Sequence, residues 1–376
     1  MNVEIGKNIS QSEGFSAFVP NKFPPEELFS VSQKILIKAA EADRLIGKLD
    51  GITHVLPDVD FFLNMFVAKD ATSSSQIEGT KATIVDAIKL DAGVVGKETD
   101  AEDILYYIQA LNYGIKRLNN FPLSLRLIRE IHKKLMLGAR STHFSDPGEF
   151  RRSQNWIGGT SPSNALFVPP PVEEMKHALD DLEKFLHNEE SVLPIIHIAL
   201  SHAQFETIHP FLDGNGRTGR LLITMLLCHR NLLERPVLFL SSYFKKHQKV
   251  YYQKLNNYHD GDVEAWVDFF LDGVIETANE SIEISKQIRA LRDKDMAKIQ
   301  VLAKRESESG ILVLSKLYAN PIITTRTVMD WTGFSRPGAQ KVIDRFIAMD
   351  ILKPQKEEGA YDQSYEYTKY LKIFVK

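Results

Sequence analysis

Apolar residues recur at three- and four-residue spacings along most of the 376-residue chain. This period restricts the chain to a mostly helical fold. Amphipathic helices are expected over nine stretches, namely 25–49, 59–78, 99–118, 124–137, 172–187, 194–208, 217–231, 244–258 and 262–292. A long polar helix over 276–308 is expected to connect them to the C-terminal part of the chain. The predicted fold class is therefore all-α.

One internal stretch, residues 150–169, reads as strand instead. Two extended pieces there flank a turn that contains Gly158, Gly159 and several Ser and Pro residues, a pattern typical of a β-hairpin. Three consecutive prolines, 169–171, end the pattern. A single hairpin is therefore expected beside the helical core.

Charge is divided unevenly along the chain. The net charge is −3, but residues 298–376 hold 13 basic and 9 acidic residues, a net charge of +4, which leaves −7 for the rest. This change of sign predicts a separate C-terminal unit. The near-neutral total excludes a protein that coats nucleic acid along its whole surface, and the 43% apolar content excludes a disordered chain.

The cysteine count and the hydropathy pattern bear on location. The single cysteine, Cys228, rules out an intramolecular disulfide and a cysteine-rich zinc site. No run of about 18 apolar residues is present to span a membrane, and the first residues lack the pattern of a secretory signal. A cytoplasmic protein that does not associate with membranes is expected.

Residues 209–220, His-Pro-Phe-Leu-Asp-Gly-Asn-Gly-Arg-Thr-Gly-Arg, lie between two helical patterns. Gly214 and Gly216 allow unusual backbone dihedrals, so successive N–H groups can point into one concavity at the positive end of a helix dipole. Such a concavity binds phosphate. Arg217 and Arg220 are three residues apart, on one helical face, where they can hold further phosphate oxygens.

The same segment carries a carboxylate and an imidazole. Asp213 supplies a hard oxygen ligand of the kind that Mg²⁺ prefers when it bridges phosphates. His209 ends the preceding helix, and histidine is the usual general base near neutral pH. The segment thus combines the groups needed for chemistry on a phosphorylated nucleotide. The plain alternative is a helix–loop–helix that binds no ligand.

A dinucleotide-binding site is a second alternative. Gly214, Gly216 and Gly219 match its G-x-G-x-x-G pattern, and Glu234 lies near the position of the ribose carboxylate. That site requires a strand before the glycines, whereas the residues before His209 have a helical pattern. No alternation of strands and helices follows, so the context argues against this alternative.

Residues 209–220 match at every defined position the signature His-Pro-Phe-x-Asp/Glu-Gly-Asn-Gly-Arg-x-x-Arg, and the chain resembles the Fic (filamentation induced by cAMP) family. The resemblance covers most of the chain. It implies a Fic-type helical core with one β-hairpin flap, and transfer of AMP from ATP to a hydroxyl side chain of a target protein, with release of pyrophosphate. ATP and Mg²⁺ are the implied substrate and cofactor.

The resemblance also implies roles for single residues. His209 would deprotonate the Ser, Thr or Tyr hydroxyl of the target, and Asp213 would hold Mg²⁺ between the α- and β-phosphates. Gly214, Asn215 and Gly216 would bind the α-phosphoryl group of the nucleotide. Arg217 and Arg220 would bind the remaining phosphates. The adenine would lie against Tyr251, Tyr252 and His259. The two tyrosines can equally be ordinary core residues.

A second motif, Ser-Ser-Gln-Ile-Glu-Gly over residues 74–79, is similar to the inhibitory pattern of this family. The resemblance implies that Glu78 pairs with Arg220 and so keeps that arginine from the γ-phosphate, while Ser74 supports the inhibitory helix. In some relatives the same glutamate assists removal of AMP from the target. The alternative is a plain surface glutamate near a helix end.

The hairpin at 150–169 would correspond to the flap of the family, which holds an extended target segment by strand addition. Ile157, Gly158 and Gly159 near its tip are then the candidates for target contact. The alternative is an ordinary exposed hairpin.

The C-terminal unit is expected to begin with three short helices over 310–352. Gly333 at a turn, Ser335 at a helix start and Pro337 in the first turn are typical of a helix-turn-helix. Strands at 352–355 and 365–368 would complete a winged-helix domain. The side chains expected to be exposed on its recognition helix are Arg336, Gln340, Lys341 and Arg345. DNA binding is one interpretation, and a protein-interaction or dimerisation module is the other.

Three parts are thus expected: an inhibitory helical extension (1–95), a Fic catalytic core (96–295) and a winged-helix-like domain (296–376). The leading hypothesis is a protein adenylyltransferase restrained by its own Glu78. The expected partners are ATP and a target protein, which can be the enzyme itself, with a homodimer left open. The alternatives are a DNA-binding regulator that senses nucleotide, and a Fic enzyme with another nucleotide donor or with de-AMPylation activity.

Overall fold

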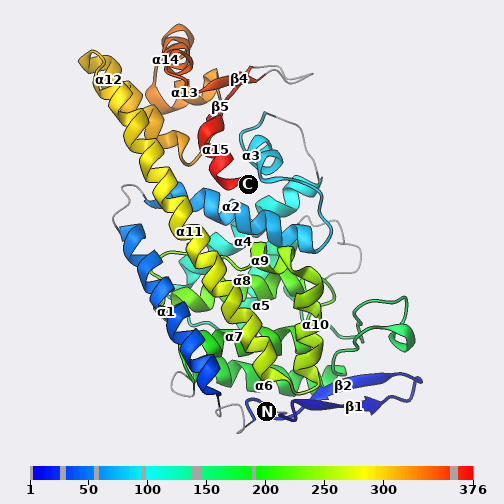
Figure 1. The fold of residues 1–376 in the computed structure, drawn as a ribbon. Helices are drawn as coiled ribbons and strands as arrows, with labels where there is room; N and C mark the ends of the chain where they lie inside the picture. Colours follow the sequence, from blue (N-terminus) through cyan, green and yellow to red (C-terminus); the bar gives the residue numbers. More distant parts are fainter. Residues whose placement is uncertain are drawn as a thin grey trace. The chain divides into compact units, whose positions relative to one another are not determined.

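The computed structural model describes residues 3–25, 31–54, 59–94, 99–137, 146–188, 192–355 and 363–375 (Figure 1). The chain is mostly helical, with a two-stranded hairpin near its N-terminus and a three-stranded sheet near its C-terminus. This composition of elements confirms the predicted fold class. The chain divides into two compact units, one formed by 1–47 and 106–278 and the other by 48–105 and 279–376.

Three helices belong to both units: α1 (Gln33–His54), α4 (Thr99–Leu118) and α11 (Val263–Gln300). The first unit further contains β1 (Gly6–Ser10), β2 (Ser16–Pro20), α5 (Leu125–Met136), α6 (Val172–His187), α7 (Pro194–Ile208), α8 (Asn215–His229), α9 (Ser241–Lys246) and α10 (Gln248–His259). The helices predicted at 172–187 and 194–208 are found with the same bounds.

Helix α7 forms the centre of the first unit. Every residue from Ile195 to Ile208 is buried, because α6, α8 and α10 all pack against this helix. Its sequence is accordingly apolar on most sides, which is typical of a central helix. The indole Nε1 of Trp266 donates a hydrogen bond to the carbonyl oxygen of Ala199, 2.8 Å away. A helix held on every side is a rigid support for the residues that follow it.

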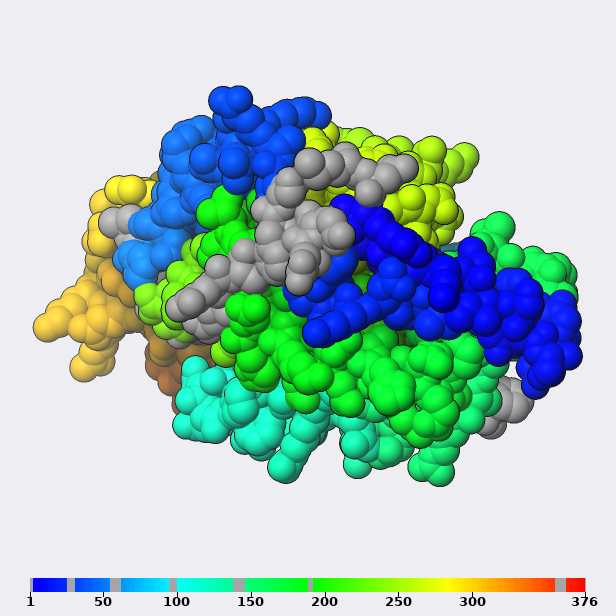
Figure 2. All heavy atoms as spheres, turned by 90° about the horizontal axis from the view of Figure 1, so that it is seen from below, coloured from blue at the N-terminus to red at the C-terminus, as the bar shows by residue number. Residues whose placement is uncertain are grey.

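The hairpin at the N-terminus was not predicted. Strands β1 and β2 pair antiparallel, with Gly6 opposite Pro20 and Ser10 opposite Ser16. Figures 1 and 2 show this hairpin beside the loop that follows residue 150, and the backbone N–H of Phe18 donates to the carbonyl oxygen of Val168 at 2.9 Å. Strands of only five residues give little periodic signal.

The hairpin predicted at 150–169 is reduced to one antiparallel bridge between Ile157 and Phe167. A short 3₁₀ helix, Pro162–Asn164, lies between them. Gly158 and Gly159 both have φ values of +70° and make the turn. The two extended pieces therefore close a loop and do not form a regular two-stranded ladder. We call residues 157–168 the flap loop.

The second unit contains α2 (Val59–Ile77), α3 (Ile84–Asp91), α12 (Lys304–Leu317), β3 (Ile322–Thr324), α13 (Thr325–Thr332), α14 (Arg336–Ala348), β4 (Lys353–Gln355), β5 (Ser364–Glu366) and α15 (Thr368–Phe374). The strands form an antiparallel sheet in the order β3-β5-β4. Helices α13 and α14 and the turn at Gly333 with φ +70° occur where the sequence predicted them, and the two late strands lie within two residues of their predicted bounds. The helix predicted over 276–308 was wrong at its end: α11 stops at Gln300, and α12 begins at Lys304 after the extended residue Ala303. The assignment to the winged-helix class stays a prediction.

Two of the four side chains expected to be exposed on α14 are engaged within the unit. Gln340 donates to the Asp344 carboxylate at 2.9 Å and accepts from the Thr325 hydroxyl at 3.1 Å. Arg345 pairs with Glu306 of α12. Arg336 and Lys341 are exposed as expected. The expectation was wrong for Gln340 and Arg345 because the neighbouring helices and strands supply polar partners for them.

Among the described residues, no helix is both long enough and apolar enough to cross a membrane. Cys228 is half-buried near the end of α8.

Candidate active site

The segment from His209 to Gly214 joins α7 to α8. His209 ends α7 in the left-handed conformation, with φ +47°, and so turns the chain sharply out of the helix. The carboxamide of Asn215 then closes the loop, because its Oδ1 accepts from the Phe211 N–H and its Nδ2 donates to the Phe211 carbonyl oxygen, both at 2.8 Å. Since that side chain is committed to the loop, Asn215 can reach a ligand only through its backbone.

Two residues from the segment before the flap loop hold the carbonyl groups of the same turn. Arg151 is 2% exposed. Its Nε donates to the His209 carbonyl oxygen at 3.1 Å. Its backbone N–H donates to the Pro210 carbonyl oxygen at 2.9 Å. Asn155 donates to the Phe211 carbonyl oxygen at 2.8 Å. Burial lowers the pKa of the Arg151 guanidinium to about 10. Neither residue was predicted from the sequence.

His132 of α5 supports the loop from the other side, and it too was missed. Its ring stacks on that of Phe211, with centroids 3.7 Å apart and planes 4° apart. Its Nδ1 accepts from the Gly148 N–H at 2.9 Å, so the proton is on Nε2, which donates to the Asp213 carbonyl oxygen at 2.9 Å. His132 therefore fixes the backbone at Asp213 as a neutral imidazole.

We predict that acid destabilises the protein partly because buried, neutral histidines such as His132 take up protons when the chain unfolds. Burial lowers the pKa of His132 and of His197 to about 4, whereas an unfolded histidine titrates near 6.5. Between these values the unfolded chain binds protons that the folded chain does not, so the free energy of unfolding falls as the pH falls. Each histidine is expected to lower it by about 2 kcal/mol between pH 7 and pH 5.

Urea denaturation at the two pH values measures this difference. The His132→Phe variant keeps a ring against Phe211 but takes up no proton, so it should show a smaller change between pH 7 and pH 5. An identical change in the variant and the unmodified chain would contradict the prediction.

Gly214 is the N-cap of α8 and adopts φ +75°. A Cβ there would lie 2.7 Å from the Met136 sulfur, so only glycine fits. No N-cap side chain covers the first turn of α8, and its N–H groups and dipole remain suited to an anion.

Arg217 lies in that first turn with its side chain only 8% exposed. Its nearest carboxylate oxygen, Asp213 Oδ1, is 4.0 Å away, and one guanidinium nitrogen faces the Met136 sulfur at 3.6 Å. Its Nε is buried and has no hydrogen-bond partner among the described residues. A buried guanidinium carries a desolvation cost unless its donors are satisfied. An anion at the α8 N-terminus would satisfy them.

Asp213 has a side chain that is 42% exposed at the rim of this loop. The described residues contain no group of three or more His, Cys, Asp or Glu side chains able to hold a metal on their own. One accessible carboxylate fits Mg²⁺ all the same, because this ion commonly binds one or two carboxylates together with substrate phosphates and water.

His209 keeps a partly open side chain, 18% exposed, at the end of α7. Its Nδ1 lies 3.3 Å from the Glu206 carbonyl oxygen and 3.8 Å from the Glu206 carboxylate. A carbonyl oxygen can only accept, so the proton is on Nδ1 and the lone pair of the neutral ring is on Nε2. That tautomer is the one a general base needs.

Arg220 is 3% exposed, one turn further along α8. The neighbouring Gly219 lets α7 and α8 approach closely, since a Cβ there would lie 2.5 Å from the Glu206 carboxylate. Arg220 therefore stands on the same helix as Arg217, in a buried position.

Of the three residues expected at the adenine, Tyr251 does not fit. It is 1% exposed, its hydroxyl donates to His202 Nε2 at 2.9 Å, and its ring stacks on that of Phe244, 4.5 Å away. It is a core residue, because the rings of Phe244, His202 and Trp266 all lie within 6.1 Å of its own. Tyr252 is 43% exposed and presents its ring to solvent.

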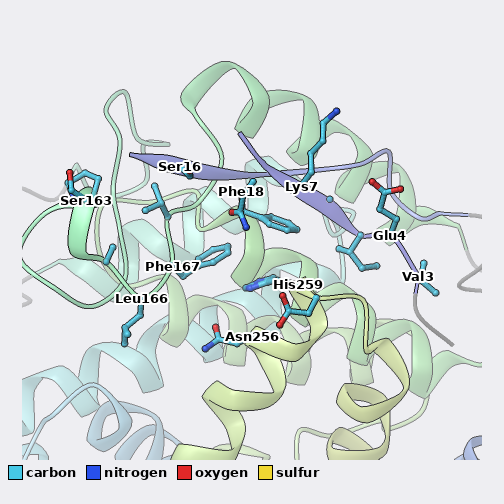
Figure 3. Close-up of a pocket in the computed structure, with 17 residues that line it drawn as sticks. Val3, Glu4, Lys7, Ser16, Phe18, Ser163, Leu166, Phe167, Asn256 and His259 are labelled. Carbon is cyan, nitrogen blue, oxygen red and sulfur yellow. The ribbon is translucent and has the colours of Figure 1, made fainter. Parts of the chain in front are cut away.

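His259, the third, lines a pocket of about 640 Å³ between the N-terminal hairpin, the flap loop and the end of α10 (Figure 3). Its ring stacks on that of Phe167 at 4.1 Å, and its Nε2 contacts the Thr207 hydroxyl at 3.0 Å. Burial lowers its pKa to about 3. A neutral, stacked imidazole at a pocket wall is compatible with a flat aromatic ligand.

The residues of the second motif belong to the second unit. Ser74 is fully buried in the last turns of α2, and Glu78 is exposed in the turn that ends the helix, where Gly79 has φ +94°. Glu78 thus follows the helix and does not lie within it. Its pairing with Arg220 stays a prediction.

Two family models match the chain. The model described as Fic/DOC family covers residues 122–227, which include the loop and α8, and the model described as Fic/DOC family N-terminal covers residues 36–116. The chain is thus similar to the Fic/DOC family over residues 36–116 and 122–227. The first match contains the candidate active site, and the second contains Ser74 and Glu78.

Curated relatives include the protein adenylyltransferase Fic of Drosophila grimshawi, 30% identical over 63% of this chain and 46% of the relative. That of Aedes aegypti is 32% identical over 48% of this chain and 34% of the relative. The matches thus span less than half the length of these two proteins.

Solved structures with the same fold include a Fic family protein from Desulfovibrio desulfuricans, with a TM-score of 0.56 and 18% identity over 90% of this chain and 97% of that chain. Another is Fic-1 of C. elegans, with a TM-score of 0.52 and 22% identity over 67% of this chain and 74% of that chain.

Proposed function

We propose that this chain is a protein adenylyltransferase that transfers AMP from ATP to a Ser, Thr or Tyr hydroxyl of a target protein. The observation that carries the proposal is the loop between α7 and α8. It combines the buried, under-coordinated guanidinium of Arg217, an uncapped helix N-terminus and the partly open imidazole of His209. These are an anion site and a base on one short segment.

In the proposed reaction, His209 Nε2 removes the proton of the target hydroxyl. The oxygen attacks the α-phosphorus of ATP, a new P–O bond forms to the target, and the bond to the β-phosphate breaks, so pyrophosphate leaves with its electron pair. The backbone N–H groups of Asn215 and Gly216 stabilise the charge on the α-phosphoryl oxygens. The Gly214 N–H instead donates to Asp213 Oδ1 at 2.5 Å and orients that carboxylate. Arg217 and Arg220 hold the other phosphates.

Asp213 is the proposed ligand of Mg²⁺. When bound, the ion neutralises phosphate charge and so favours attack at phosphorus. Because His132 holds the Asp213 carbonyl group and Asn215 closes the loop before it, the carboxylate is presented from a fixed backbone. We place the nucleobase toward Tyr252 and His259, and we leave Tyr251 out of the site.

Inhibition is assigned to Glu78 in this proposal. A carboxylate paired with Arg220 would occupy the guanidinium that otherwise binds the γ-phosphate, and it would place a negative charge where the phosphate has to lie. The support is the motif at residues 74–79 inside the matched N-terminal family model. The target segment is proposed to bind along the flap loop near Ile157, Gly158 and Gly159.

The Arg217→Met variant tests the anion site. Loss of a charge-assisted contact of about 1.5–3 kcal/mol should weaken ATP binding by about 10- to 100-fold. Isothermal titration with ATP and Mg²⁺, in the Glu78→Gly background, measures the dissociation constant. Arg44→Met, on the surface of α1 with a side chain 67% exposed, is the matched control. An unchanged dissociation constant for Arg217→Met would remove Arg217 from the site.

A further inference from the structure

The N-terminal hairpin, residues 6–20, is anchored on the end of α10. The Val3 N–H, just before β1, donates to the Gly261 carbonyl oxygen at 3.1 Å. Gly261 has φ +91°, and a Cβ there would lie 2.5 Å from the Val3 carbonyl oxygen. The backbone of the hairpin thus approaches the end of α10 as closely as glycine allows.

The same hairpin is joined to the flap loop by its backbone. The Phe18 N–H of β2 donates to the Val168 carbonyl oxygen at 2.9 Å. One residue earlier, the Phe167 carbonyl oxygen accepts from the Ile157 N–H at 2.8 Å. Residues 167 and 168 therefore lie between β2 on one side and the outgoing arm of the flap loop on the other. The hairpin extends the one bridge that the flap loop has.

Side chains strengthen this junction. Phe18 is 3% exposed, and its ring centroid lies 5.8 Å from that of Phe167 and 5.1 Å from that of His259. Phe167 in turn stacks on His259 with planes 12° apart. Figure 3 shows the three rings together beneath the strands, with the Lys7 side chain pointing away from them.

The junction leads to the helix that carries the candidate base. The Thr207 hydroxyl donates to the Ala203 carbonyl oxygen at 2.8 Å, so His259 Nε2 is the donor in its 3.0 Å contact with Thr207. Thr207 precedes His209 by two residues on α7. A chain of direct contacts therefore runs from Phe18 through Phe167 and His259 to α7.

We propose that Phe18 is a positioning residue: through its backbone bond to Val168 and its ring on Phe167 and His259, the N-terminal hairpin sets the flap loop relative to His209. This inference rests on the proposed function in so far as the flap loop presents the target hydroxyl. Without the Phe18 ring, Phe167 of the flap loop loses the aromatic surface that holds it in place.

Hydrogen exchange of the full chain tests the positioning without any reaction. In Phe18→Ala, the rate of amide exchange at Ile157 and Phe167 should rise by at least about tenfold, because the hydrogen bonds between these two residues open more often. Exchange in α13 and α14 should stay unchanged. Val19→Ala, at the next position of the same strand, is the matched control and should leave the flap loop as it is. Unchanged exchange in Phe18→Ala, or an equal rise in Val19→Ala, would overturn the proposal.

Transfer activity supplies the second readout, in the Glu78→Gly background. Phe18→Ala should lower the rate of AMP transfer at saturating ATP by about tenfold or more, since a small misplacement of reacting groups is costly. Because the Phe18 ring also lies 5.1 Å from that of His259, which we place near the nucleobase, the dissociation constant for ATP should rise by a smaller factor than the rate falls. Phe18→Leu, which restores most of the apolar bulk, should recover much of the rate. A loss in ATP affinity equal to the loss in rate would overturn the positioning role.

The two proposals fail in different ways. If the Glu78→Gly parent transfers no AMP, the proposed function is wrong, and the exchange experiment still decides whether Phe18 holds the flap loop. If the parent is active but Phe18→Ala transfers AMP at the parental rate, the positioning role is wrong and the proposed function stands.

Discussion

His209→Ala is expected to abolish AMP transfer, with a loss of about 10²- to 10⁴-fold, the range for removal of a general base. The reason is the tautomer that the structure imposes. With Nδ1 turned to the Glu206 carbonyl oxygen, the lone pair of the neutral ring is on Nε2, and no alanine can replace it. The anion site is made by α8 and its arginines, so ATP binding should stay nearly unchanged.

Transfer is measured with labelled ATP in the Glu78→Gly background, and binding by calorimetry. His177→Ala, an exposed histidine on α6, is the matched control and should behave as the parent does. Transfer that persists in His209→Ala would show that another group removes the proton. A parallel loss of ATP binding would show that His209 belongs to the anion site.

Glu78→Gly is expected to raise AMP incorporation by about 10- to 100-fold, including incorporation into the enzyme itself. The physical reason is the charge-assisted pair with Arg220 that we propose, since such bonds contribute about 1.5–3 kcal/mol. Without the carboxylate, the guanidinium is available to the γ-phosphate. Glu78 follows the last turn of α2, so its replacement should leave the helix itself intact.

Glu78→Gln separates charge from shape. It keeps the length of the side chain and removes the negative charge, so it should activate the enzyme to a large fraction of the glycine variant. Glu174→Gln on the exposed surface of α6 is the control. If both variants at position 78 stay as inactive as the unmodified chain, Glu78 is a surface residue with no inhibitory part.

The helices could be predicted from the sequence because apolar residues recur along them with a helical period. Helices α6 and α7 occur with their predicted bounds, since the prolines at positions 171 and 194 mark where each begins and the apolar spacing fills the rest. Helix α3, with eight residues, is too short for such a period to emerge. The N-terminal hairpin was not predicted for the same reason, because its strands have five residues each and β1 is largely exposed.

Only part of the candidate site could be predicted from the sequence. The residues between His209 and Arg220 are contiguous, so their chemistry shows in the sequence. Their supports come from elsewhere in the chain: His132 precedes the loop by 77 residues or more, and nothing local distinguishes it from any other histidine on an apolar helix face. The same holds for Arg151 and Asn155, whose donors meet the loop only after folding.

Tyr251 illustrates the opposite error. Neighbouring tyrosines suggested a stacking platform for a base, but adjacent residues on a helix point in different directions. Tyr251 faces α7 and the aromatic core, and Tyr252 faces outward. Helical position therefore separates two residues of the same type into a core residue and an accessible one.

The central claim, transfer of a nucleotide to a protein hydroxyl, is tested most directly by mass spectrometry. The Glu78→Gly protein is incubated with Mg²⁺ and each nucleoside triphosphate in turn, and the intact protein and its peptides are weighed. The account predicts an added adenylyl group on a Ser, Thr or Tyr residue with ATP, and none when His209 is also replaced by alanine. No added mass with ATP, or an equal addition in the His209→Ala double variant, would contradict it.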